Sequence, residues 1–328
     1  MLLALGLLIA GLVLLVKGAD WLVDGASTIA RRLGVTELAI GLTIVAFGTS
    51  LPELTVNIFS SLTGANDIAI GNIVGSSTAN ILLILGIAAI VAPLAVQTST
   101  VWKEIPLAIL AAVTLFIMAN DQWIDGYAIS ELSRTDGFTL ISFFLIFLWY
   151  IVGMQRVEDG HEKETRTLPI ATGMMGAGLL LLVVGGKIAV DGAVSIATFL
   201  GVSQALIGLT VVAIGTSLPE LATSVVAARK GKADIAIGNI VGSNIFNIFW
   251  VLGVSASIRH LTFRPELNID LLVGILATII LFIVVHTGAL HRRLLFWQQR
   301  SGHIIERKEG FLMLLVYAAY LAYLVWRG

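Results

Sequence analysis

The sequence predicts an all-α polytopic membrane protein with ten transmembrane helices, arranged as two inverted repeats of five helices each. Three observations predict this fold class: an apolar composition, ten long apolar segments, and a strong similarity between the two halves of the chain. Each half also carries the same polar motif inside an apolar segment, and this pair of motifs locates a candidate functional site.

The composition is typical of a membrane protein. Of the 328 residues, 57% are hydrophobic and 12% are charged, whereas a soluble domain has about 25% charged residues. The formal net charge of −1 gives no indication of a nucleic-acid partner. The chain has no cysteine, which excludes disulfides, thiol catalysis and thiolate metal ligands. We therefore expect a lipid bilayer around the protein, and no cofactor.

Long apolar segments recur along the whole chain. A helix needs about 20 apolar residues to cross the hydrocarbon core of a bilayer. The first segment lacks the basic and small-residue pattern of a cleaved signal, so it is interpreted as the first span. The predicted spans cover 2–30, 37–62, 68–92, 104–119, 137–155, 168–199, 204–228, 234–258, 268–287 and 309–326. The predicted polar loops cover 120–136, 156–167 and 288–308.

The two halves of the chain are copies of one unit. Shifted by 167 positions, residues 41–76 match residues 208–243 with 23 identities in 36 positions. The predicted boundaries are 1–155 for the first repeat, 156–167 for a cytoplasmic linker and 168–328 for the second repeat, with the most similar parts at about 37–92 and 204–258. Because each unit has five spans, the second unit enters the membrane from the opposite side. Inverted repeats of this kind are the architecture of many secondary transporters.

The basic residues of the loops predict the orientation. With the N-terminus outside, fourteen lysines and arginines of the loops face the cytoplasm and four face the exterior. Cytoplasmic loops of membrane proteins carry an excess of these residues. We therefore expect a multi-pass protein of the cell (inner) membrane with both termini outside.

The first motif interrupts the second span of each half. Residues 48–54 read Gly-Thr-Ser-Leu-Pro-Glu-Leu, and residues 215–221 repeat the same seven residues. Since proline cannot donate a hydrogen bond to the carbonyl one turn before it, each span is predicted to bend or break there. Thr49 and Glu53 are four residues apart and share a helix face. The carboxylate, the hydroxyls and the freed carbonyls are hard oxygen donors, which suit Na⁺ or Ca²⁺.

The second motif lies in the third span of each half. The pattern Gly-Asn-x-x-Gly-Ser ends at Ser76 in the first half and at Ser243 in the second. Asn80 and Asn247 follow these serines by four residues, so each serine shares a helix face with its asparagine. The third spans are therefore predicted to add further oxygens to the site.

The acidic residues near these motifs receive two interpretations. A charge at the centre of a bilayer costs several kcal/mol, so Glu53 and Glu220 are predicted to be functional. Asp67 and Asp234 stand at the start of apolar runs and are predicted to be helix N-caps. Isolated hydroxyls and glycines in membrane helices often serve only packing or their own helix.

The paired motifs resemble the two α-repeats of the cation/calcium exchanger superfamily, and especially bacterial and archaeal Na⁺/Ca²⁺ exchanger-type proteins, over essentially the whole chain. The resemblance implies their ten-helix inverted-repeat fold, with Ca²⁺ and Na⁺ as the transported ions. It implies a central Ca²⁺ site made by Thr49, Glu53, Thr216 and Glu220. It also implies flanking sites for Na⁺ or another coupling ion, made by Ala46, Ser50, Ser76, Asn80, Ala213, Ser217, Ser243 and Asn247. The chain departs from the family pattern at Ser77, where Asn is frequent, and at Asn247, where some members have Asp.

The charge of the predicted site suggests its mechanism. Two glutamates carry a charge of −2, which one Ca²⁺, two Na⁺ or two protons would neutralise. A cavity that accepts either load is expected to work as an exchanger by alternating access, with the monomer sufficient for transport. The first hypothesis is Ca²⁺ export driven by Na⁺ entry, and the alternative is a Ca²⁺/H⁺ or other cation/H⁺ antiporter. A cation channel ranks lower because it does not need inverted halves, and no enzymatic activity is expected.

Overall fold

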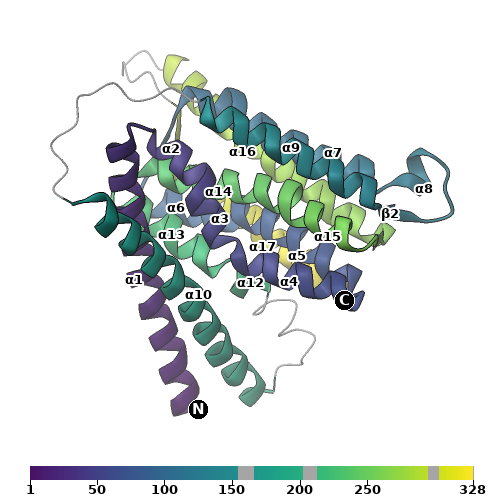
Figure 1. The fold of residues 1–328 in the computed structure, drawn as a ribbon, viewed down its shortest axis with the longest axis horizontal. Helices are drawn as coiled ribbons and strands as arrows, with labels where there is room; N and C mark the ends of the chain where they lie inside the picture. Colours follow the sequence, from purple (N-terminus) through teal and green to yellow (C-terminus); the bar gives the residue numbers. More distant parts are fainter. Residues whose placement is uncertain (154–165, 202–212, 295–302, 328) are drawn as a thin grey trace.

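The computed structural model describes residues 1–153, 166–201, 213–294 and 303–327 (Figure 1). This part of the chain contains eight helices that are long and apolar enough to cross a membrane, and a bent helix pair adds a ninth span. The predicted span 204–228 lies partly outside the described residues, and the predicted loop 156–167 lies mostly outside them. The predicted loop 288–308 is wrong at both ends, because a helix continues to Leu294 and a strand covers His303–Ile305.

The helices of the first half follow the predicted spans closely. They are α1 (Leu2–Leu33), α2 (Glu37–Ile40), η1 (Gly41–Val45), α3 (Ala46–Thr49), α4 (Leu51–Thr63), α5 (Asn66–Ala79), η2 (Asn80–Leu85), α6 (Gly86–Val91), η3 (Thr100–Glu104), α7 (Ile105–Met118), α8 (Asp121–Ile124) and α9 (Arg134–Val152). Continuous spans are formed by α5 with η2 and α6, and by η3 with α7. Glycines in the left-handed conformation, Gly34 and Gly64, end α1 and α4.

The second half repeats this order. Its helices are α10 (Leu168–Phe199), α12 (Ala213–Thr216), α13 (Leu218–Arg229), α14 (Ala233–Phe246), η5 (Asn247–Leu252), α15 (Gly253–Ile258), η6 (Pro265–Leu267), α16 (Asn268–Leu294) and α17 (Arg307–Arg327). The predictions for Asp67 and Asp234 as N-caps are wrong, because α5 and α14 start one residue before them, with Ala65 and Lys232 at the cap positions.

The longest helices, α1 and α10, lie side by side and project from the other helices (Figure 1). Glycines spaced seven residues apart line their contact: Gly11, Gly18 and Gly25 on α1, and Gly178, Gly185 and Gly192 on α10. A Cβ atom on Gly18 would lie 2.8 Å from the carbonyl oxygen of Gly178. Successive glycines toward the end of α1 contact residues successively nearer the start of α10, so the two helices are antiparallel. We call this contact the glycine seam.

Two pairs of short strands join the halves of the chain, which the sequence had not predicted. Strand β1 (Leu94–Val96) pairs antiparallel with β4 (His303–Ile305), and β2 (Ser130–Leu132) pairs antiparallel with β3 (Leu261–Phe263). Strands β1 and β3 occupy equivalent positions in the two repeats. Gln97, just after β1, donates to Asp234 at the start of α14, and Asn66, at the start of α5, donates to Thr262 in β3. Equivalent elements therefore meet exchanged partners, as an inverted repeat requires.

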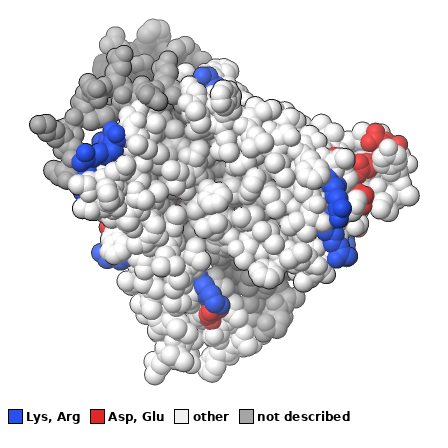
Figure 2. All heavy atoms as spheres, viewed as in Figure 1, with Lys and Arg blue, Asp and Glu red and all other residues white. Residues whose placement is uncertain are grey.

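The surface agrees with a bilayer around the protein. Figure 2 shows a face on which uncharged side chains predominate and charged ones are confined to a few places, mostly near its edges. Large apolar side chains such as Phe59, Trp149 and Leu180 are exposed on the helices, which lipid rather than water would tolerate. With the span at 204–228 counted, the fold is all-α and polytopic, with ten transmembrane helices in two inverted repeats.

Two buried carboxylates outside the predicted site have local partners. Glu104, at the end of η3, is fully buried and accepts a hydrogen bond from the Tyr150 hydroxyl. Asp270, in α16, is buried, accepts a hydrogen bond from Tyr320 at 2.9 Å, and lies 2.9 Å from Arg327. Donors from α9 and α17 thus stabilise these acids, although Oε2 of Glu104 has no hydrogen-bond partner among the described residues. Neither burial nor one unpartnered oxygen alone therefore distinguishes the acids of the candidate site, which differ by facing each other's half of the chain.

Candidate functional site

The second span of each half breaks at its motif, as the proline and glycine predict. The helix direction changes by 48° between Glu37–Thr49 and Leu51–Thr63. Ser50 connects the two pieces in the first half, and Ser217 connects α12 with α13 in the second. Each break leaves backbone groups without helical partners and places a serine and a glutamate one turn apart at the start of the next helix. The break therefore brings polar groups into the interior.

The third spans also change their winding at the site. A π-helical turn begins at Asn80 in the first half, and another begins at Asn247 in the second. Such turns are rare in proteins as a whole, and those that occur are often found at functional sites. The π-helical turns begin at equivalent positions of the two repeats, and in each case the predicted site asparagine is the first residue.

The two motifs meet across the halves. The Ser50 hydroxyl donates to Oε1 of Glu220 at 2.9 Å, and the Ser217 hydroxyl donates to Oε1 of Glu53 at 3.4 Å. Ser243 lies 3.0 Å from the Ser50 oxygen and donates to Glu220 at 3.5 Å. Each half therefore supplies a serine to the carboxylate of the other half, and neither half alone completes this arrangement.

Both glutamates keep one oxygen without a protein partner. Glu53 is 1% exposed and Glu220 is fully buried. Their Oε2 atoms have no hydrogen-bond partner among the described residues. Leaving a buried carboxylate oxygen unpaired is costly, and two carboxylates from different halves add their charges. A bound cation would compensate both effects, and oxygen ligands of this kind suit Na⁺ and Ca²⁺.

Thr49 is fully buried and contacts both its own helix and the other half. Its hydroxyl lies 3.3 Å from the carbonyl of Ala46 and 2.9 Å from Oδ1 of Asn239 in α14. Asn239 in turn donates to the carbonyl of Glu220 at 3.4 Å and to Ser224 at 3.0 Å. The sequence showed Asn239 within the repeated Gly-Asn motif, but only the packing of α14 against α3 reveals it as a neighbour of Thr49.

The remaining predicted ligands differ in their surroundings. Ser76 and Asn247 are buried, and none of their side-chain polar atoms has a hydrogen-bond partner in the described part of the chain. Asn80 is buried, and its Oδ1 has no hydrogen-bond partner among the residues that the structure describes. Thr216, which ends α12, is half-buried. Ala213 begins α12, but its side chain lies outside the described residues.

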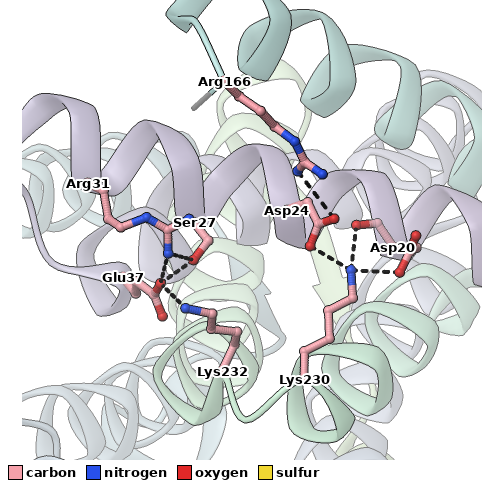
Figure 3. Close-up of polar contacts among 8 residues, drawn as sticks. All are labelled: Asp20, Asp24, Ser27, Arg31, Glu37, Arg166, Lys230 and Lys232. Atoms are coloured by element: carbon pink, nitrogen blue, oxygen red, sulfur yellow. Dashed lines mark hydrogen bonds and ion pairs between the residues drawn. The ribbon is translucent and has the colours of Figure 1, made fainter. Parts of the chain in front are cut away.

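Ion pairs tie α1 to the rest of the molecule at one end (Figure 3). The members of this α1 ion-pair cluster are Asp20, Asp24, Ser27, Arg31, Glu37, Arg166, Lys230 and Lys232. The ammonium of Lys230, in the turn after α13, lies 2.6 Å from carboxylate oxygens of both Asp20 and Asp24 on α1. Lys232 lies 2.7 Å from Glu37, which also accepts a hydrogen bond from Ser27. Both lysines therefore connect the second half with the first.

The charge of Lys230 is stabilised by these contacts. Burial lowers the pKa of Lys230, but its hydrogen bonds to Asp20 and Asp24 and the negative charges of both aspartates raise it. The net result is a pKa above the ordinary value for lysine. Lys230 is therefore charged throughout the neutral pH range, and its ion pairs persist there.

The opposite end of the molecule lacks the equivalent pairs among the described residues. Asp20 and Lys230 correspond in the repeat to Lys187 and Thr63. Lys187 pairs at 3.3 Å with Asp191 on its own helix, and both side chains are exposed. In the described part of the chain, the hydroxyl of Thr63 bonds to carbonyls of its own helix. The α1 ion-pair cluster thus breaks the symmetry between the halves.

Comparisons with known proteins agree with these features. The family described as sodium/calcium exchanger protein matches residues 3–153 and 170–326. Inner membrane protein YrbG of Escherichia coli (strain K12) is 41% identical over 246 residues, which cover 70% of this chain and 73% of the relative. Sodium/calcium exchanger MaX1 of Methanosarcina acetivorans is 34% identical over 320 residues, which cover 84% of this chain and 85% of the relative. A solved structure of the sodium–calcium exchanger NCX_Mj, soaked with Na⁺ and Ca²⁺, has a TM-score of 0.80 and 33% identity, with 98% of each chain covered.

Proposed function

Since the chain belongs to the sodium/calcium exchanger protein family, we propose that it exports Ca²⁺ in exchange for Na⁺. Membership makes it a multi-span membrane cation antiporter. The observation that carries the choice of ions is the pair of buried glutamates, each hydrogen-bonded by a serine of the other half and each with one unpartnered oxygen. The proposal is one of transport without covalent chemistry, for which a monomer is sufficient.

The charge of the site supports exchange between a divalent and a monovalent ion. Glu53 and Glu220 together carry −2, which one Ca²⁺ or two Na⁺ would balance in the low-dielectric interior. Ca²⁺ takes 6–8 oxygen ligands in proteins. The two carboxylates, Thr49, Thr216 and the serines of the motifs are the oxygen donors proposed for it. Because both loads need the same carboxylates, binding of one displaces the other.

Alternating access requires part of the protein to move past the site. The helices α1 and α10 are proposed to move as one unit, because the glycine seam holds them together outside the remaining helices. The α1 ion-pair cluster would then hold this unit in place at the cytoplasmic end, with both termini outside. A cysteine placed at the exposed Thr167, next to this cluster, tests the orientation: labelling by an impermeant thiol reagent from outside the cell would contradict it.

Flux measurements test the proposed ions directly. Purified protein in proteoliposomes is expected to take up Ca²⁺ when an outward Na⁺ gradient is imposed, and not when K⁺ replaces Na⁺. A proton gradient alone is expected to drive little uptake. Uptake that follows the proton gradient and ignores Na⁺ would overturn the proposal in favour of a Ca²⁺/H⁺ antiporter, and uptake without any counter-ion gradient would indicate a channel.

The α1 ion-pair cluster predicts an effect on access. Lys230→Met keeps the apolar stem and removes the charge that Asp20 and Asp24 share. Partly exposed pairs contribute up to about 1 kcal/mol each, so we expect the fraction of protein open to the cytoplasm to rise by about 5-fold. The apparent Ca²⁺ affinity should rise on the cytoplasmic side and fall on the outer side, measured as flux in vesicles of each orientation.

Lys187→Met is the matched control for this prediction. It removes the same charge from α10, where the partner of Lys187 among the described residues is Asp191 on its own helix. We expect it to leave the ratio of the two apparent affinities unchanged. Equal effects of the two substitutions, or no effect of Lys230→Met, would contradict a role of the cluster in access.

A further inference from the structure

The amide of Asn244 has a single possible orientation. Its nitrogen donates to the backbone carbonyl of Ser77 at 3.1 Å. A carbonyl only accepts hydrogen bonds, so the nitrogen of Asn244 must face it. The oxygen of Asn244 therefore points the other way, toward Asn80. Since Asn244 is 4% exposed, water does not compete for this contact.

This orientation fixes the amide of Asn80 in turn. The nitrogen of Asn80 donates to Oδ1 of Asn244 at 3.0 Å. Its own oxygen then lies on the opposite side, buried and without a hydrogen-bond partner in the described part of the protein. If Asn80 turned its amide over, two amide oxygens would face each other. Asn244 thus favours the one orientation in which Asn80 presents an oxygen to a cation.

The other half of the chain lacks an equivalent side chain that orients its asparagine amide. Asn247 is the repeat equivalent of Asn80, and the equivalent of Asn244 is Ser77. The short side chain of Ser77 has no hydrogen-bond partner, and neither amide atom of the fully buried Asn247 has one among the described residues. The amide of Asn247 is therefore free to present either its oxygen or its nitrogen.

We propose that Asn244 is a positioning residue that holds the oxygen of Asn80 toward the coupling cation, and that Ser77 leaves Asn247 without an equivalent. The inference rests on the proposed function. It specifies which flanking ligand already has its oxygen oriented toward the site before the ion binds. Asn80 is a fixed ligand, and Asn247 must be oriented by the cation itself. A site whose oxygen-bearing side chains are already oriented binds its ion more tightly, because those side chains lose less conformational freedom on binding.

Exchange of the two positioning residues tests this inference. Asn244→Ser should raise the Na⁺ concentration for half-maximal transport by about 3- to 10-fold, while the maximal rate changes by less than about 2-fold. Ser77→Asn should supply the missing positioning residue to Asn247 and lower the half-maximal Na⁺ concentration by about 2- to 5-fold. Na⁺ binding to purified protein, measured by titration calorimetry, should change in the same directions.

A carboxylate at position 247 provides the control. Asn247→Asp has two equivalent oxygens and no orientation to fix, so adding Ser77→Asn to it should change Na⁺ affinity by less than about 1.5-fold. A gain of equal size in both backgrounds would overturn the inference, because the effect would then not depend on amide orientation.

Failure of the inference and of the proposed function can be distinguished. If the wild type binds Na⁺ but Asn244→Ser and Ser77→Asn bind it with unchanged affinity, the inference is wrong and the proposed function stands. If the wild type binds neither Na⁺ nor Ca²⁺, both are wrong. Should Asn244→Ser not fold, Ser77→Asn alone decides the question, because it removes no existing hydrogen bond.

Discussion

Glu53→Gln and Glu220→Gln are each expected to lower Ca²⁺ transport by more than about 100-fold. Each substitution keeps the side-chain shape and removes one of the two charges that face the site. Loss of one partner from a buried charge arrangement costs about 3–5 kcal/mol, and each 1.4 kcal/mol corresponds to about tenfold. The amide also replaces an unpartnered carboxylate oxygen by a group that can be a donor, which repels a cation. Ca²⁺ flux into proteoliposomes at equal protein content measures the loss.

Glu104→Gln is the matched control for these two variants. Glu104 is also a buried carboxylate in a membrane span, but its partner is Tyr150 and it lies outside the two motifs. A glutamine can still accept the hydrogen bond from Tyr150, so we expect transport to remain within about 2-fold of the wild type. If all three variants lost transport equally, the loss would reflect the removal of any buried charge. If Glu53→Gln and Glu220→Gln both retained transport, the central site would be wrong.

The second large effect is expected at the glycine seam. Gly18→Leu would place a Cβ atom 2.8 Å from the carbonyl oxygen of Gly178 and 2.9 Å from the nitrogen of Leu182. Both are backbone atoms, so the helices must separate, and overpacking of this kind costs about 1–3 kcal/mol. Because α1 and α10 are proposed to move as one unit, we expect transport to fall by about 10-fold or more when they separate.

Gly6→Leu separates this effect from a general change in α1. No heavy atom lies within 4 Å of a Cβ built on Gly6, so the same substitution on the same helix does not force two backbones apart. Transport should remain near the wild-type rate, and the midpoint of thermal unfolding should fall only for Gly18→Leu. Indistinguishable behaviour of the two variants would contradict the close approach of α1 and α10. Retained Ca²⁺ binding in Gly18→Leu would indicate that the seam acts on movement rather than on the site.

The spans could be predicted from the sequence because hydropathy alone decides them. Helix α10 begins at Leu168 and ends at Phe199, as predicted, and α14 with η5 and α15 covers Ala233–Ile258. The break at Ser50 was also predictable, because proline at position 52 cannot donate to the preceding turn. Local chemistry was sufficient in each of these cases.

Features that depend on packing between distant residues were not predictable. The contact between Thr49 and Asn239 joins residues 190 positions apart, and nothing near either residue specifies it. The π-helical turns Asn80–Leu85 and Asn247–Leu252 are apolar after their first residue and contain no proline or glycine, so no local irregularity announces them. Asp67 was misassigned because the preceding turn ends at Gly64 with a positive φ of 79°, which lets the next helix begin before the aspartate. The seven-residue spacing of the seam glycines is present in the sequence, but only the structure shows that these glycines of α1 contact the backbone of α10.

The reciprocal contacts between Ser50 and Glu220 and between Ser217 and Glu53 have a consequence for the ancestry of the chain. A single five-helix unit holds one serine and one glutamate of this arrangement, so it could complete the site only beside a second copy inserted in the opposite orientation. In such a symmetric pair every substitution occurs twice, once toward each side of the membrane. A single chain that carries both copies is free of that constraint, because each half can change alone. Lys230 can therefore pair with α1 while its equivalent, Thr63, bonds to its own helix, and the two sides of the membrane are separately adjustable by mutation.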